Sequence, residues 1–160
     1  MSNTSIFVKC IKVTTENQHI YFNLIQSYEA EFSPITGKKP NVQGLFELDT
    51  QLDAQHSGFI VYVDDLPAGI AAIATKQNQQ FEVCEFYVVP YYRKQAVGKQ
   101  FAHQLWQQYI GYWEVKQIQG AEYATQFWRK VIATYTNNQF NESQYQDEYW
   151  GAVTRQTFYS

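Results

Sequence analysis

Residues 84–99 read CEFYVVPYYRKQAVGK, and this stretch indicates the fold more clearly than any other. A dense apolar run meets Pro90, a short basic loop follows, and the spacing then becomes helical. That order predicts a buried strand that leads into the N-terminus of a helix. The first amides of a helix have no partners within it, and the helix dipole adds partial positive charge there. We therefore expect a phosphate-binding junction at this point.

The size and charge of the chain exclude several classes of protein. Its 160 residues fit one domain over residues 1–160. A net charge of -3 disfavours general nucleic-acid binding, which normally needs a basic domain. No segment has the roughly 18 continuous apolar residues that a membrane span requires. Residues 1–5 do not resemble the start of a signal peptide. We expect a cytoplasmic protein with no membrane or nucleic-acid partner.

The cysteines and histidines give no sign of a metal site. Cys10 and Cys84 lie in apolar, strand-like runs, which favours buried thiols over a disulfide or metal ligands. His19, His56 and His103 have no ligand spacing with either cysteine. We therefore expect no metal.

The rest of the chain alternates between strand and helix patterns. Apolar alternation predicts strands over residues 6–13, 59–63, 68–75, 81–89, 113–118, 139–145 and 149–158. Helical spacing predicts helices over residues 97–110 and 124–135, and a first helix that presents Ile20, Leu24, Ile25, Tyr28 and Phe32 on one side.

The limits of the first helix follow from local signals. Thr14 or Thr15 is the expected cap, since Thr15 and Gln18 have capping-box spacing. Ser33-Pro34 is expected to end the helix. A short second helix is expected over residues 45–54.

The connections between strands predict the sheet. Tight turns between residues 59–63, 68–75 and 81–89 indicate an antiparallel meander. The strand–helix–strand unit around Pro90 requires a parallel crossover. We therefore expect an α/β protein with a mixed, mostly antiparallel sheet of six to seven strands and helices on both faces.

At this point the chain resembles the GNAT superfamily of acetyl-CoA-dependent N-acetyltransferases. The family's acyl-CoA motif is Q/R-x-x-G-x-G/A, and residues 93–98 read RKQAVG after the lead-in Val88-x-Pro90-x-Tyr92. Ala96 stands where the first motif glycine is usual. The resemblance spans nearly the whole chain and implies the GNAT acyl-CoA N-acyltransferase fold. It also implies transfer of an acetyl group from acetyl-CoA to a primary amine, by direct attack in a ternary complex.

The resemblance also implies which residues contact the cosubstrate. Backbone amides of residues 94–99 would hold the pyrophosphate, and a backbone N–H at Val88 would polarise the thioester carbonyl. A solvated basic helix start is the alternative interpretation of the loop. The implied cofactor-binding residues are Val88, Arg93, Lys94, Gln95, Ala96, Val97, Gly98, Lys99 and Trp128.

A second resemblance, to a subgroup of bacterial GNAT-like predicted acetyltransferases, lies in WEV at residues 113–115 and AxxFWRK at residues 124–130. Many relatives have asparagine where Ala121 stands, and tyrosine where Trp128 stands. That tyrosine often protonates the departing thiolate, which an indole cannot do. Trp128 would lie beside the pantetheine or in the core. The tyrosines left as candidate acids are Tyr87, Tyr123 and Tyr135.

Glu85 is the candidate general base. Strict alternation places Phe81, Val83, Tyr87 and Val89 on one side of the strand and Cys84, Phe86 and Val88 on the other. A carboxylate in such an apolar run is costly unless it is paired or functional. Partial burial would raise its pKa and suit it to accept a proton from an ammonium group. The alternatives are an ion pair with a neighbouring helix and a carboxylate that faces a wet cleft.

The acceptor side is expected at the first helix and the loop to residue 58. Acidic and aromatic groups together suit a cationic amine, although a mixed acidic face is common on soluble helices. His56 is either part of this cleft or a surface residue. The terminal hairpin and exposed aromatics offer an edge for a homodimer. The acceptor-side candidates are Tyr28, Glu29, Glu31, Phe32, Phe46, Glu47 and Asp49.

Two other functions stay open. One is a catalytically weak or inactive GNAT-fold module that binds acyl-CoA as a sensor, which the altered motif positions favour. The other is an interaction domain without a cofactor, and the presence of both Arg93 and Gly98 speaks against it.

Overall fold

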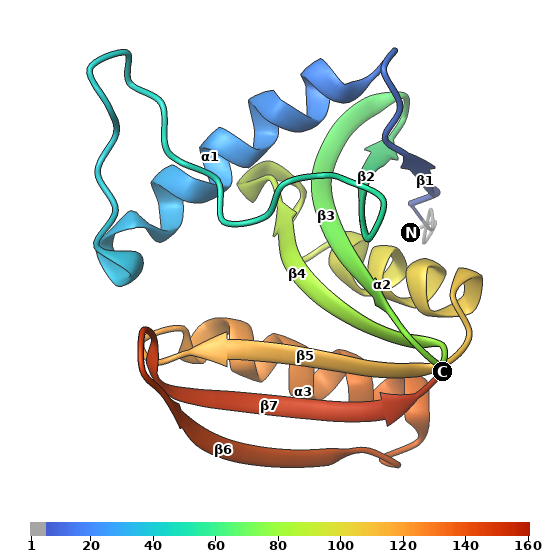
Figure 1. Ribbon diagram of the computed structural model, residues 1–160. Helices are drawn as coiled ribbons and strands as arrows, with labels where there is room; N and C mark the ends of the chain where they lie inside the picture. Colours follow the sequence, from blue (N-terminus) through green and yellow to red (C-terminus); the bar gives the residue numbers. More distant parts are fainter. Residues whose placement is uncertain (1–5) are drawn as a thin grey trace.

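The computed structural model describes residues 6–160, so the expectation about a signal peptide at residues 1–5 lies outside the described residues. Figure 1 shows a seven-stranded sheet with α-helices on both of its faces. The elements are β1 (Val8–Lys12), α1 (Gln18–Thr36), β2 (His56–Val63), β3 (Leu66–Lys76), β4 (Gln80–Val88), a 3-10 turn at Pro90–Tyr92, α2 (Val97–Gln108), β5 (Tyr112–Ile118), α3 (Glu122–Thr136), β6 (Asn141–Asp147) and β7 (Gly151–Tyr159).

The sheet has the mixed topology predicted from the sequence. Its strand order is β1-β2-β3-β4-β5-β7-β6. The pair β4–β5 is parallel and every other pair is antiparallel. Helix α2 connects the two parallel strands, because such strands cannot be joined by a tight turn. The closing hairpin is also confirmed, with each strand shifted by about two residues from its predicted range.

The sheet separates the core into two clusters, one on each face. Helix α1 contributes Tyr21 and Ile25 to a smaller cluster on one face of the sheet. Helices α2 and α3 pack on the opposite face, where Trp106 and Ile132 belong to the larger cluster. Within residues 6–160, no helix is long and apolar enough to cross a membrane.

The limits predicted for the first helix are wrong at both ends. Asn17 is the N-cap, and its side-chain Oδ1 accepts the Thr14 N–H at 2.7 Å instead of capping the helix. Pro34 lies inside the helix, which continues to Thr36. Proline has no N–H to donate to the Ala30 carbonyl, and the Ser33 hydroxyl donates to that carbonyl at 2.7 Å instead. Gly37, at φ 76°, then ends α1.

The predicted second helix over residues 45–54 is absent, and residues 37–55 form a long loop that we call the strap. The Gln26 side chain donates to the Phe46 carbonyl at 3.0 Å and accepts the Phe46 N–H at 2.8 Å. Leu48 and Leu52 pack against the α1-side core. The backbone of the strap thus finds partners on α1, which removes the need for helical hydrogen bonds.

The two cysteines are free thiols, and both are half-buried, whereas the sequence predicted buried side chains. Burial raises the pKa of both Cys10 and Cys84 to about 12. Both thiols are therefore protonated and unreactive at neutral pH.

Candidate active site

The sheet opens between its two parallel strands. Strands β4 and β5 pair only from Gln80–Tyr112 to Val83–Val115. Beyond this point β4 continues along β3 to Val88, whereas β5 continues along β7 to Ile118. Figure 1 shows the two strands running together and then parting. Among the described residues, the edge of β4 that faces β5 consequently has no strand partner over residues 85–88.

A β-bulge precedes the open edge and corrects the predicted faces of β4. Ala72 pairs with Glu85 and Ile73 with Val83, so Cys84 is unmatched. Phe81 and Val83 lie on the α2–α3 face together with Phe86 and Val88, whereas Tyr87 lies on the α1 face. The extra residue shifts the alternation by one position. It also places Glu85 on the α1 face, where the carboxylate meets the strap.

Glu85 is buried, with 6% of its surface exposed. Thr50 of the strap donates to Glu85 Oε1 at 3.0 Å. Burial raises the pKa of Glu85 to about 7; hydrogen bonds from Tyr28 and Thr50 oppose the rise, and the charges of Glu29 and Asp49 add to it. A carboxylate with that pKa can both accept and release a proton near neutral pH.

A cavity of about 400 Å³ lies at the opening. Its walls come from both faces of the sheet, since Tyr28 and Phe32 belong to α1 whereas Ala124 and Trp128 belong to α3. Glu85 and the β5 residues Val115 to Ile118 line its middle. The cavity therefore passes through the gap between β4 and β5, with one end towards α1 and the strap and the other towards α3. The remaining wall residues include Glu29, Thr36, Asp49, Thr50, Tyr145, Asp147, Trp150 and Val153.

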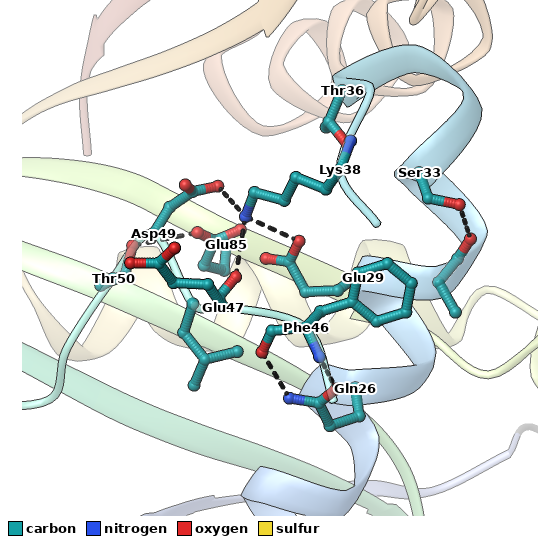
Figure 2. A network of polar contacts seen from close by, with 12 residues as sticks. Gln26, Glu29, Ser33, Thr36, Lys38, Phe46, Glu47, Asp49, Thr50 and Glu85 are labelled. Carbon is teal, nitrogen blue, oxygen red and sulfur yellow. Dashed lines mark hydrogen bonds and ion pairs between the residues drawn. The ribbon is translucent and has the colours of Figure 1, made fainter. Parts of the chain in front are cut away.

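Three carboxylates converge at the α1 end of the cavity. Oxygen atoms of Glu29, Asp49 and Glu85 all lie within 4.8 Å of one another. Lys38 Nζ donates to Glu29 Oε2 at 2.9 Å and to Asp49 Oδ2 at 2.8 Å, as Figure 2 shows. It also donates to the Glu47 carbonyl at 3.0 Å. This end of the cavity is anionic, and an ammonium group already lies in it.

The predicted phosphate loop presents a row of main-chain donors. Within residues 6–160, the structure records no acceptor for the N–H of any residue from 94 to 99. Lys94 and Ala96 adopt left-handed conformations, with φ 63° and φ 62°. Left-handed residues in such a loop turn successive N–H groups towards one concave side. Gln95 steadies the loop by donating its side-chain amide to the Tyr91 carbonyl at 3.0 Å.

Arg93 links this loop to α1. Its Nε donates to the Val88 carbonyl at 2.9 Å, and its guanidinium binds both oxygens of Glu31 at 2.9 and 2.8 Å. It also lies 5.6 Å from the centre of the Tyr87 ring. The guanidinium thus fixes the end of β4. Its predicted contact with the cosubstrate stays a prediction, as do those of the exposed side chains of Lys94 and Lys99.

Val97 and Gly98 join the start of α2 to the core. The Val97 side chain is buried, so only its backbone faces the loop. A Cβ on Gly98 would lie 3.0 Å from Phe127 Cζ and 3.1 Å from its Cε2. Glycine therefore lets the first turn of α2 approach α3 closely. The motif glycine has a packing role here in addition to any contact with a ligand.

Trp128 lies in the core and also reaches the cavity, whereas its contact with the pantetheine stays a prediction. It is buried at 5% exposure, and its ring lies 4.7 Å from that of Phe86 in an edge-to-face arrangement. It also lines the α3 end of the cavity. None of the candidate acids Tyr87, Tyr123 and Tyr135 lines that cavity among the described residues.

The structure sorts the acceptor-side candidates. Tyr28, Glu29, Phe32 and Asp49 line the cavity. Glu31 binds Arg93 instead, and Glu47 offers only its carbonyl, to Lys38. Phe46 anchors the strap through its backbone, and His56 pairs with Asp53 at 2.8 Å. Sequence reasoning missed Lys38, Thr50, Tyr145 and Trp150. Lys38 carries no local signal, because the carboxylates that it binds lie 9 and 11 positions away in the sequence.

The whole fold is shared with solved acetyltransferase structures. An acetyltransferase from Thermus thermophilus is 9% identical and superposes with a TM-score of 0.70, covering 98% of this chain and 99% of that chain. An acetyltransferase from Bacillus subtilis in complex with CoA is 10% identical, with a TM-score of 0.59 over 96% of this chain and 99% of that chain. These likenesses confirm the predicted fold.

A third solved structure contains a bisubstrate analogue. Arabidopsis thaliana Naa50, in complex with the bisubstrate analogue CoA-Ac-MVNAL, is 12% identical, with a TM-score of 0.60 over 94% of this chain and 97% of that chain. No family model and no curated protein sequence matches this chain.

Proposed function

We propose that this chain, which has the fold of the GNAT superfamily of N-acetyltransferases, transfers an acetyl group from acetyl-CoA to an amine. The observation that carries the proposal is the gap between β4 and β5, crossed by a cavity that opens towards both faces of the sheet. Two reactants can enter such a cavity from opposite ends and meet at Glu85. This arrangement suits direct attack in a ternary complex.

The cosubstrate would lie at the α3 end. The six amides of residues 94–99 suit a pyrophosphate group, helped by the N-terminus of α2. The unpaired edge of β4 over residues 85–88 suits the amides of the pantetheine arm, which would add to the sheet as a further strand. The N–H at Val88 would polarise the thioester carbonyl, which becomes an oxyanion when the amine attacks.

The acceptor would lie at the α1 end. Its amine must be neutral to attack, and Glu85, with a pKa of about 7, is the candidate to take its proton. The C–N bond then forms as the carbonyl becomes an oxyanion. When this intermediate collapses, the C–S bond breaks, and coenzyme A leaves as a thiolate that takes up the remaining proton lost by the amine. The carboxylates of Glu29 and Asp49 favour an acceptor that arrives with positive charge.

The proposal is tested by measuring thiol release from acetyl-CoA in the presence of a panel of amines. The panel includes polyamines, aminoglycosides and peptides with a free N-terminus. We expect release that depends on the amine, together with an N-acetylated product in the mass spectrum. Release that is unchanged by every amine, or no binding of acetyl-CoA at millimolar concentration, contradicts the proposal.

A second candidate is a module that binds acyl-CoA without turnover. It is favoured by Trp128, which lines the α3 end of the cavity where many relatives carry an acidic tyrosine. Calorimetric binding of acetyl-CoA without thiol release from any amine would select this function over catalysis.

The cytoplasmic location and the homodimer through the β6–β7 hairpin stay predictions. Light scattering coupled to size-exclusion chromatography measures the oligomeric state directly, and a monomer at the concentrations of the assay would contradict the dimer.

A further inference from the structure

The strap is fixed to α1 at one end of the cavity. Long loops without secondary structure are uncommon in compact domains and are often lids or binding loops. Here the side chain of Gln26 binds the backbone of Phe46 on both its N–H and its carbonyl. Further along, Thr50 binds Glu85. The strap therefore contributes directly to the wall at the candidate base.

Lys38 provides the charged part of this attachment. Its side chain is 15% exposed and its Nζ contacts carboxylates on two separate elements, Glu29 of α1 and Asp49 of the strap. Lys38 itself lies at the start of the strap, and its bond to the Glu47 carbonyl is a second contact with the later part of this loop. Figure 2 shows Nζ between these groups with Glu85 beside them. The ammonium thus lies where the proposed acceptor would bring its own.

Lys38 is unsuited to be the acceptor itself. Burial alone would lower its pKa, but the hydrogen bonds and charges of Asp49 and Glu29 outweigh burial and raise it. A lysine that stays protonated cannot attack a thioester. Its ammonium can nevertheless occupy the position that the ammonium group of a free amine ligand needs. The same contacts hold the strap against α1.

We propose that Lys38 is an internal competitor for the acceptor, whose ammonium occupies the carboxylate pair Glu29–Asp49 and must be displaced before an amine can bind. The identity of the displacing amine as the acceptor rests on the proposed function. The competition itself rests only on the contacts of Lys38. A bound competitor lowers the apparent affinity for a ligand by the fraction of molecules in which the site is free. The strap would thereby select amines that are positively charged at neutral pH.

The test measures binding of n-butylammonium chloride by calorimetry without acetyl-CoA, against sodium chloride at equal ionic strength. Replacement of Lys38 by alanine (K38A) removes the competitor. We expect the dissociation constant to fall at least about tenfold relative to the parent. The neighbouring, exposed Lys39 supplies the matched control, since K39A should bind as the parent does. Adding E29Q to K38A should abolish the gain.

Equal affinity of the parent and K38A for the probe, or an equal gain in K39A, would overturn the proposal. A second measurement covers the case in which K38A does not fold. K38M keeps the aliphatic stem, and hydrogen exchange over residues 41–50 should be faster in K38M than in the parent and in K39M. Unchanged exchange would show that Lys38 does not hold the strap, and would equally overturn the proposal.

The two proposals can fail separately. If K38A gains affinity for the probe but no amine releases thiol from acetyl-CoA, the competitor stands and the acetyltransferase function fails. If thiol is released but K38A and the parent bind the probe alike, the function stands and the competitor fails.

Discussion

The two sides of the candidate site use different parts of the chain to present polar groups. On the side proposed for the cosubstrate, the donors are main-chain amides of residues 94–99, none of which lines the cavity among the described residues, and the α3 wall offers the apolar side chain of Trp128. At the α1 end, the polar groups are the side-chain carboxylates of Glu29, Asp49 and Glu85. The cosubstrate side therefore depends on backbone conformation, whereas the α1 end depends on which residues stand at three positions. Substitutions should separate the two ends cleanly.

The largest effect is expected from Glu85→Gln. Loss of the candidate base should lower kcat on the order of 100-fold, because general-base catalysis contributes roughly that much. The dissociation constant of acetyl-CoA should change less than about twofold, since the amides of residues 94–99 are untouched. Thiol release and calorimetry measure the two quantities, with Glu16→Gln on the exposed surface as the control. Equal turnover of variant and parent from about pH 6 to pH 9 would remove Glu85 from the mechanism.

The same carboxyl group should make stability depend on pH. Its pKa in the folded protein is about 7 against an ordinary 4.5, so the folded state binds the proton more tightly. This contribution is complete below the ordinary pKa and is lost as the pH rises through 7. The free energy of unfolding of the parent should therefore fall relative to Glu85→Gln by up to about 3 kcal/mol across this range. Urea unfolding at several pH values measures the difference, and parallel curves for the two proteins would contradict the burial of the charge.

Gly98→Ala should disturb the other end. The added Cβ would lie 3.0 Å from Phe127 Cζ, which forces the first turn of α2 away from α3. We expect a loss of about 1–3 kcal/mol in the free energy of unfolding, and weaker binding of acetyl-CoA. Thermal unfolding and calorimetry measure both. Phe127→Leu in the same chain relieves the contact and should restore part of each loss. Parent-like stability of the single variant would show that α2 has room to shift.

Ala96→Gly should have the smallest effect, with the opposite sign. Alanine at φ 62° carries a left-handed strain of roughly 1 kcal/mol, part of which the greater freedom of unfolded glycine offsets. A net gain of about 0.5 kcal/mol is expected. Acetyl-CoA should bind equally well or better, because glycine allows a closer approach to the phosphate. Ala96→Val supplies the contrast and should lose stability, since a β-branched residue tolerates this conformation poorly. Losses in both variants would mean that Ala96 does not need a left-handed backbone.

The phosphate-loop end could be predicted from the sequence because its signals are contiguous. Strand, proline, loop and helix follow one another within residues 84–99, and each has a local pattern. The parallel crossover then followed from the connection alone. The sequence did not indicate that Arg93 would bind Glu31, because the two residues are 62 positions apart.

The carboxylate end could be predicted only in outline. Glu85 was identified from its apolar neighbours, but its partner Thr50 lies in a loop that carries no periodic pattern. Lys38 likewise reaches Glu29 and Asp49 through tertiary folding. The sequence did not predict the bulge at Cys84, because cysteine and its apolar neighbours fit either face of a strand. The continuation of α1 past Pro34 depended on one serine hydroxyl that replaces a missing donor.

The unmatched Cys84 has a consequence for how this protein tolerates insertions and deletions. The extra residue in β4 determines which face of the sheet each later residue of the strand occupies. Because of it, Val83 and Phe86 lie on the same face although an odd number of positions separates them. Deletion of Cys84 would leave the neighbouring side chains on their present faces and would remove only the β-bulge. Deletion of a second residue would move the side chains of Tyr87 and Val88 each to the opposite face of the sheet. We therefore expect β4 to tolerate the loss of Cys84 but not the loss of a second residue between Val83 and Phe86.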